Sequence, residues 1–122
     1  MTGWCQEINP LKASQLAQDH NNLLIDIRSA SDWMQGIPSH ATMMSVEQLV
    51  AQESELRAQF QSIFLLCYQG QTSLQWARRL GPPFQSVQGG FTAWQNANLS
   101  QSQPDFEPTI NRYDRQIKLL GE

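Results

Sequence analysis

The chain has 122 residues, of which 40% are hydrophobic and 16% charged, and its formal net charge is −3. This length supports one domain with a single hydrophobic core. The acidic balance argues against nucleic acid as a partner. No apolar run reaches transmembrane length and the start of the chain lacks a signal-peptide pattern, so we expect no membrane association and a cytoplasmic location.

The two cysteines, Cys5 and Cys67, do not form a disulfide framework. No Cys/His cluster has the spacing of metal ligands, and we expect neither a metal nor another cofactor. Cys5 precedes the first predicted element, and we interpret it as a bystander rather than a resolving thiol. Residues 1–107 hold five Lys/Arg against nine Asp/Glu, so any anion site must be local and built from backbone dipoles.

The first half of the chain alternates helices and strands. Asn9 and Pro10 are a good helix start, an N-cap followed by proline at the first helical position. Residues 23–27, apolar apart from Asp26, predict a buried strand. Residues 29–35 predict a short helix ending at Gly36, 36–39 a loop, and 41–44 a brief strand. Ser45 and Gln48 fit a capping box, which predicts one helix from there to about residue 59.

The second half repeats the alternation. Residues 63–66 predict a strand buried on both faces, followed by a loop and a helix that Gly81 and two prolines end. Residues 84–87 predict a strand, 88–90 a turn and 91–98 a last helix. The composition of 100–108 is that of a linker. The whole pattern predicts an α/β domain with a largely parallel sheet, helices on both faces, and a ligand site beyond the carboxyl ends of the strands.

Cys67 lies at the carboxyl end of the strand at 63–66 and faces the start of the next helix, for which Thr72 or Ser73 is the expected N-cap. Unpaired loop N–H groups and the helix dipole favour a thiolate there, which predicts a nucleophile. The alternative is a small buried core residue, which is what a cysteine after an apolar run often is.

The loop composition separates two kinds of cysteine chemistry. Cysteine phosphatases need an arginine at the sixth position after the nucleophile to bind a phosphoryl dianion, and here that residue is Ser73. No residue from Tyr68 to Ser73 is basic, so phosphatase activity is disfavoured. A neutral loop suits a thiolate or a singly charged persulfide held by N–H donors, with Gly70 letting the backbone curl around the sulfur.

Asp26 stands inside the apolar strand at 23–27, and a buried carboxylate needs partners. Arg28 follows two residues later on the same side of an extended chain. We interpret both residues as structural support. His20 and His40 are interpreted as solvated turn or loop residues.

Cys67-Tyr-Gln-Gly-Gln-Thr-Ser resembles the active-site loop of the rhodanese (sulfurtransferase) superfamily, particularly single-domain members of the GlpE type. Three further segments match in the right order. Leu24-Ile-Asp-Ile-Arg28 resembles the Asp-x-Arg strand of the family, Asp32-Trp-Met-Gln-Gly36 its acidic–aromatic segment, and Gln88-Gly-Gly-Phe-Thr-Ala-Trp94 its final Gly-Gly-x-x-x-Trp element. The resemblance covers residues 5 to about 99, and it implies a rhodanese-like fold with a five-stranded sheet.

The resemblance implies persulfide chemistry. The Cys67 thiolate would take a sulfane sulfur from a donor such as thiosulfate and pass it to cyanide or a thiol. The loop N–H groups from Tyr68 through Gln69, Gly70 and Gln71 to Thr72 would stabilise thiolate and persulfide, and the hydroxyls of Thr72 and Ser73 would add donors. Two features depart from the family: its loop histidine is displaced to His40, and Tyr68 replaces the basic residue that many members place after the cysteine.

The tail, Arg112-Tyr-Asp-Arg-Gln-Ile-Lys-Leu-Leu-Gly-Glu122, resembles the opening of adenylyltransferases of the MoeB/ThiF and ubiquitin-activating type, although the simpler interpretation is a short amphipathic helix. No glycine-rich nucleotide loop follows. We therefore divide the chain into a rhodanese domain (1–99), a linker (100–108) and this tail (109–122). A MoeB/ThiF-type adenylyltransferase or a sulfur-carrier protein would be a partner. The alternative to an enzyme is a non-catalytic rhodanese-like docking module or sulfur-relay partner.

Overall fold

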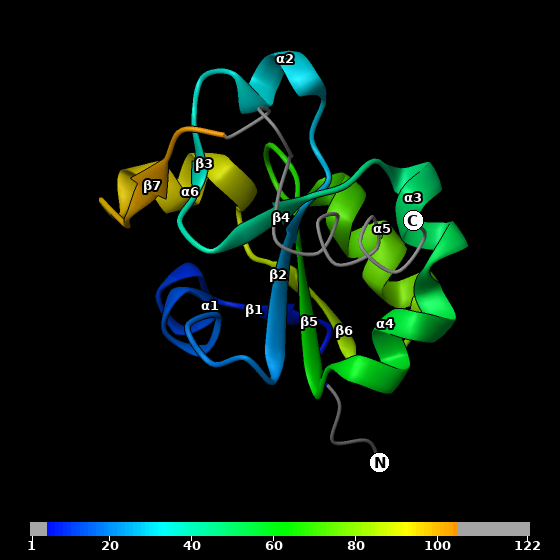
Figure 1. Cartoon of the computed structure of the whole chain (residues 1–122). Coiled ribbons are helices and arrows are strands. Elements are labelled where there is room, and N and C mark those ends of the chain that lie inside the picture. The colour runs from blue at the N-terminus through cyan, green and yellow to red at the C-terminus, as the bar shows by residue number, and fades with distance from the viewer. Residues whose placement is uncertain (1–4, 105–122) are drawn as a thin grey trace.

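A computed structural model describes residues 5–104 of the chain. Its centre is a five-stranded sheet of order β1-β6-β5-β2-β4, in which every neighbouring pair is parallel. Helices lie on both faces (Figure 1). The predicted α/β class and parallel sheet are confirmed. The strands are β1 (Glu7–Ile8), β2 (Asn22–Asp26), β4 (Ala41–Met43), β5 (Ser62–Leu66) and β6 (Phe84–Val87).

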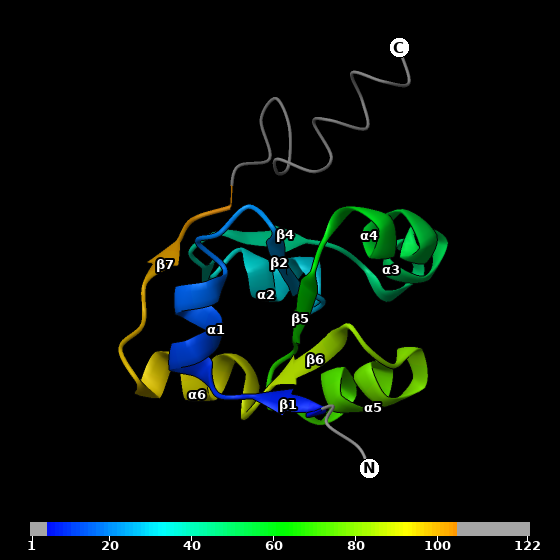
Figure 2. The ribbon, with the colours of Figure 1, turned by 90° about the horizontal axis from the view of Figure 1, so that it is seen from below.

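Figure 2, which looks along the sheet, shows α1 and α6 on one side and α3, α4 and α5 on the other. The first pair are α1 (Pro10–Leu16) and α6 (Gly90–Asn96); the second group are α3 (Val46–Ala51), α4 (Glu53–Gln59) and α5 (Gln71–Leu80). Each side has its own apolar core. The core beneath α1 and α6 is centred on Phe64 and Trp94, and the core on the other side on Ile63, Leu65 and Phe84.

The central strands β2 and β5 are buried on both faces because helices cover the sheet on each side. Side chains alternate between the two cores, so that Phe64 and Leu66 belong to one, and Ile63 and Leu65 to the other. This alternation continues past the end of β5. Cys67 therefore points to the same side as Leu65, which is the side of α5.

Most local helix signals are confirmed, and the exceptions are the helix predicted through residues 45–59 and the start of α5. The Asn9 side chain accepts the Lys12 N–H at 2.8 Å, and Ser45 and Gln48 form the predicted capping box. The prediction of one helix through residues 45–59 was wrong. The backbone leaves the helical region at Gln52, where α3 ends and α4 begins. Leu49 and Leu56, on the two sides of this break, are both fully buried, so packing against the sheet outweighs helix continuity.

A second, two-stranded sheet pairs β3 (Ile37–Pro38) antiparallel with β7 (Gln101–Ser102). The sequence predicted a loop at 36–39 and a linker from residue 100, and neither pattern indicated this pairing. It lies beside α6, whose Trp94 donates its ring N–H to the Ser100 carbonyl at 2.9 Å. The short helix α2 (Ala30–Trp33) precedes β3 and has Ser29 as its N-cap. Residues 105–122, with the adenylyltransferase-like tail, lie outside the described residues.

Within residues 5–104, no helix has the length and apolarity needed to cross a bilayer. The same residues contain no group of three or more His, Cys, Asp or Glu side chains placed to hold a metal ion.

Candidate active site

Cys67 follows directly after β5, at the carboxyl end of the sheet, and 7% of its surface is exposed. The predicted position at a strand end facing a helix is therefore observed. The residue is nevertheless part of the apolar core on the α5 side, as the alternative interpretation required. The hydrogen bonds around the sulfur distinguish it from an ordinary core residue.

Two backbone N–H groups donate to the Cys67 sulfur, that of Gly70 at 3.1 Å and that of Ser73 at 3.3 Å. The N-cap of α5 is Gly70 and not Thr72 or Ser73, because Gly70 takes a left-handed backbone with φ of 96°. Ser73 is therefore the third residue of the helix, where the N–H has no partner inside the helix. The Cys67 sulfur fills the place of a capping side chain at the start of α5, because it accepts both N–H groups.

The start of α6 is hydrogen-bonded to the backbone of the cysteine loop. The N–H of Phe91 donates to the Cys67 carbonyl at 2.8 Å, and the N–H of Thr92 donates to the Tyr68 carbonyl at 3.1 Å. This approach requires glycine at position 90, where φ is 61° and a Cβ would lie 2.7 Å from the Tyr68 carbonyl oxygen and also collide with that of Cys67. The second glycine of the Gly-Gly element is therefore a packing requirement of the cysteine loop.

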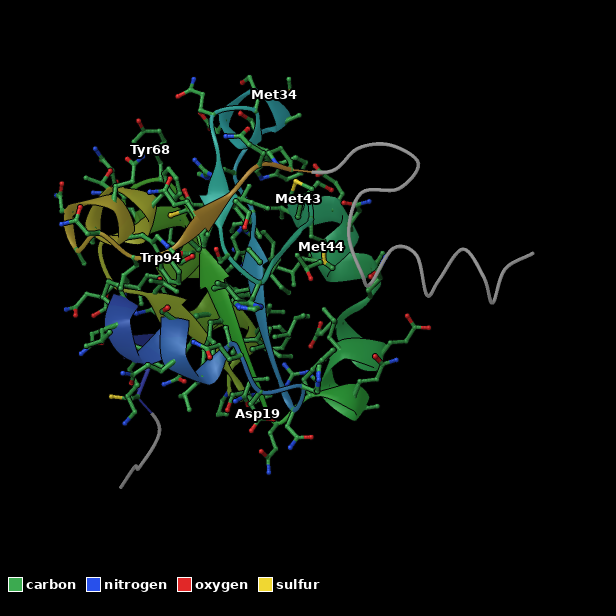
Figure 3. The ribbon with its side chains drawn as sticks, turned by 60° about the vertical axis from the view of Figure 1, so that its left-hand side comes forward. Asp19, Met34, Met43, Met44, Tyr68 and Trp94 are labelled. Atoms are coloured by element: carbon green, nitrogen blue, oxygen red, sulfur yellow. The ribbon has the colours of Figure 1, made fainter. Side chains whose placement is uncertain are left out.

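A surface cleft of about 330 Å³ opens over the sulfur. The side chains that line it carry no charge; they are Cys67, Tyr68, Gln69, Gln71 and Thr72. Tyr68 is 51% exposed, and Figure 3 shows it at the same end of the molecule as Met34 and opposite Asp19. Four of the predicted loop residues thus line one cleft. Of the N–H groups predicted to hold the sulfur, those of Tyr68 to Thr72, the Gly70 N–H does so, and the second donor, the Ser73 N–H, was not predicted. Ser73 is fully buried, and its hydroxyl lies 3.3 Å from the sulfur.

Asp26 and Arg28 form a buried ion pair of 2.8 Å on the other face of the sheet. The Arg28 guanidinium also donates to the Gly36 carbonyl at 2.7 Å and stacks on the Phe91 ring, with 3.8 Å between its carbon and the ring centroid. Neither residue lines the cleft. Their link to it is Phe91, whose N–H binds the Cys67 carbonyl.

Known proteins share this sequence pattern and fold. The sequence matches the family model of the rhodanese-like domain over residues 9–97. The chain belongs to the rhodanese-like domain family. A rhodanese-related protein from Thermoplasma volcanium superposes with a TM-score of 0.66 at 15% identity, over 81% of this chain and 99% of that chain.

Two other solved structures share this fold. Thiosulfate sulfurtransferase from Pseudomonas aeruginosa has a TM-score of 0.65 and 16% identity, and the match covers 95% of this chain but 25% of that one. A protein of unknown function from Rhodopseudomonas palustris, described as a possible tyrosine phosphatase, has a TM-score of 0.67 and 17% identity, over 80% of this chain and 84% of that one. At these identities the likeness establishes the fold.

Other candidate residues of this rhodanese-like domain lie apart from the cleft. Cys5 is exposed and precedes β1, so it lies at the amino ends of the parallel strands, whereas Cys67 lies at their carboxyl ends. His40 is an exposed residue between β3 and β4 with a positive φ of 72°. His20 is exposed in the turn before β2.

Ser86 was not among the predicted site residues. It is a fully buried residue of β6, and its hydroxyl lies 2.6 Å from that of Ser73. The available signal was a serine two residues after Phe84, at a position of the strand that alternation assigns to the core. A hydroxyl in such a position needs a buried partner.

Proposed function

We propose that this rhodanese-like domain is a sulfurtransferase. It would move a sulfane sulfur from a donor such as thiosulfate to a thiol or cyanide acceptor through a persulfide on Cys67. The observation that carries the proposal is the Cys67 sulfur itself, which accepts two backbone N–H groups at the base of an uncharged cleft. Membership of the rhodanese-like family supports it, as does the likeness in fold to thiosulfate sulfurtransferase.

The reaction has two balanced steps. The Cys67 thiolate attacks the outer sulfur of thiosulfate, a new S–S bond forms, the old one breaks, and sulfite leaves with the electron pair. Cyanide or a thiolate then attacks the terminal sulfur of the persulfide. The Cys67–S bond breaks, thiocyanate or a new persulfide leaves, and the Cys67 thiolate is regenerated.

The Gly70 and Ser73 N–H groups would bind negative charge on the sulfur in both resting and leaving-group states. The cleft walls would receive donor and acceptor, with Thr72 and the exposed Tyr68 at the mouth. Asp26 and Arg28 would act at a distance, by fixing α6 behind the loop. A singly charged persulfide matches this set of neutral donors, since no opposite charge is needed to hold it.

We also propose a cytoplasmic location and a small thiol or a sulfur-carrier protein as the physiological acceptor. A MoeB/ThiF-type adenylyltransferase would be the enzyme that activates such a carrier. The alternative to an enzyme is a docking module that binds a partner of this kind without transferring sulfur. The N–H groups converging on Cys67 favour the enzyme, because a docking surface has no use for a stabilised thiolate.

One protein of similar fold is described as a possible tyrosine phosphatase, but this chain lacks the cationic residue that phosphatase chemistry needs. Position 73 carries a serine in place of the arginine that a phosphoryl dianion requires, and its side chain is buried against Cys67 and Ser86. The described side chains around the cleft supply no other cation. We therefore expect no turnover of phosphate esters.

The test is thiocyanate production from thiosulfate and cyanide by the purified chain, with a phosphate ester offered in parallel. We expect thiocyanate from the native chain and from Cys5→Ser, and none from Cys67→Ser. The docking module is the better account if no thiocyanate forms and no persulfide accumulates. Hydrolysis of the phosphate ester would instead favour the phosphatase.

A further inference from the structure

A buried pair of hydroxyl groups connects the Cys67 loop to strand β6. The Ser73 hydroxyl oxygen lies 3.3 Å from the Cys67 sulfur and 2.6 Å from the Ser86 hydroxyl oxygen. Both serines are 0% exposed. Ser86 shares a strand face with Phe84, which packs in the core beneath α5. An apolar residue would satisfy packing there, whereas a hydroxyl must find a hydrogen-bond partner.

The 2.6 Å contact is the strong interaction in this cluster. Ser73 and Ser86 also lie 3.4 Å and 3.5 Å from the Gly70 carbonyl oxygen, at the outer limit for a hydroxyl donor. That carbonyl already accepts the Leu74 N–H at 3.2 Å. Each hydroxyl has a single hydrogen to donate. The direction of the hydrogen between the two serines therefore decides what the Ser73 hydroxyl offers to the sulfur.

Two arrangements satisfy the cluster, one for each state of the sulfur. With a thiol, the S–H donates to Ser73, Ser73 donates to Ser86, and Ser86 donates to the Gly70 carbonyl. With a thiolate, the sulfur has no hydrogen, Ser86 donates to Ser73, and the Ser73 hydroxyl donates to the sulfur. The second arrangement gives the thiolate a third donor in addition to the N–H groups of Gly70 and Ser73.

We propose that Ser86 is a positioning residue, whose hydroxyl holds that of Ser73 as the third donor to the Cys67 thiolate. This inference rests on the proposed function, since it treats Cys67 as the reacting group. Without the Ser86 hydroxyl, the Ser73 oxygen loses its 2.6 Å partner, and no donor remains to orient and polarise the Ser73 hydroxyl toward the sulfur. Ser86 does not touch the cleft, so it acts only through Ser73.

The test measures the reactivity of Cys67 without any sulfur donor. In a Cys5→Ser background, where Cys67 is the single thiol, the rate of alkylation by iodoacetamide at pH 7 is compared among variants. We expect Ser86→Ala to lower the rate by about tenfold, the effect of losing one hydrogen bond to a charged group. Ser73→Ala should lower it similarly. The double variant should be no slower than Ser73→Ala alone, because the two residues act as one unit.

Thr42→Val is the matched control, since it removes a buried hydroxyl from β4, outside the cysteine loop. Its rate should equal that of the background, and thermal unfolding should show that all variants fold. An alkylation rate that Ser86→Ala leaves unchanged overturns the inference. A double variant whose fold-reduction in alkylation rate equals the product of the two single reductions also overturns it, because the two residues would then act independently. A native chain that forms no persulfide but shows the coupled loss of alkylation contradicts the proposed function and supports the role of Ser86.

Discussion

Two buried polar groups lie at the carboxyl ends of neighbouring strands, and they are held in opposite ways. Asp26, at the end of β2, faces the α6 side and has the cationic Arg28 as its partner at 2.8 Å. Cys67, just after β5, faces the α5 side and has neutral N–H and hydroxyl partners at 3.1 to 3.3 Å. The carboxylate is closed off from solvent, whereas the sulfur lines a cleft.

Under the proposed function, this difference separates a structural group, Asp26, from the reacting group, Cys67. The Arg28 guanidinium compensates the charge of the Asp26 carboxylate at close range, and the carboxylate is closed to any ligand. Neutral dipoles hold the Cys67 sulfur without a fixed counter-charge, and the sulfur lines a cleft through which a sulfur compound can reach it. The two groups are joined by Phe91, which stacks under Arg28 and donates its N–H to the Cys67 carbonyl. The ion pair therefore contacts the cysteine loop through Phe91 and does not line the cleft.

The largest expected effect comes from breaking the ion pair. Arg28→Met leaves the Asp26 carboxylate buried without its cation and should lower the free energy of unfolding by about 3–5 kcal/mol. Chemical denaturation measures this loss. Glu53→Gln is the control, because it breaks the half-exposed Arg57–Glu53 pair and should cost less than about 1 kcal/mol. Equal losses in the two variants would mean that the Asp26–Arg28 pair is no more structural than a surface pair.

A smaller effect is expected where α6 meets the cysteine loop. Gly90→Ala should cost about 1–3 kcal/mol for its left-handed backbone and more for the collision with the Cys67 and Tyr68 carbonyls. The displaced loop should also lower the alkylation rate of Cys67. Gly81→Ala is the control for backbone strain without a collision, since φ of 76° and ψ of −177° disfavour an L side chain there but nothing lies within 4 Å of the added Cβ. Equal stability losses in the two variants would contradict the close packing of α6 against the loop.

The smallest effect concerns charge at the cleft mouth. Tyr68→Lys would add a cation beside the sulfur, and we expect the KM for thiosulfate to fall a few-fold, with the gain shrinking as salt is raised. Tyr68→Gln, which removes the ring without adding charge, is the control and should give no such salt dependence. A KM that does not change with the lysine would show that neutral dipoles alone set the affinity for the donor anion.

Much of this arrangement could be predicted from local patterns. Apolar runs located β2 and β5, the capping box located the start of α3, and Gly81 located the end of α5. The strand at 84–87 has the predicted bounds. These signals are local, because a buried strand, a cap or a glycine stop is decided within a few residues.

The remaining features depend on contacts between distant segments. Gly70 is the N-cap of α5 because the loop curls tightly against Gly89 and Gly90. The usual preference for Ser or Thr at an N-cap therefore predicted the wrong residue. The β3–β7 pair joins residues more than 60 positions apart, and neither partner is long enough to show a strand pattern. The role of Ser86 depends on its contact with Ser73 across a strand–helix interface. The two partners of each contact lie in different segments, so no local sequence pattern contains both.

The most direct test of the central claim is the site of sulfur loading. The Cys5→Ser chain is treated with thiosulfate, digested and analysed by mass spectrometry. We predict a gain of one sulfur atom on the peptide that contains Cys67, removed by cyanide, and no gain in Cys67→Ser. Sulfur on Cys5 of the Cys67→Ser variant, or a native chain that remains unloaded, would contradict the account.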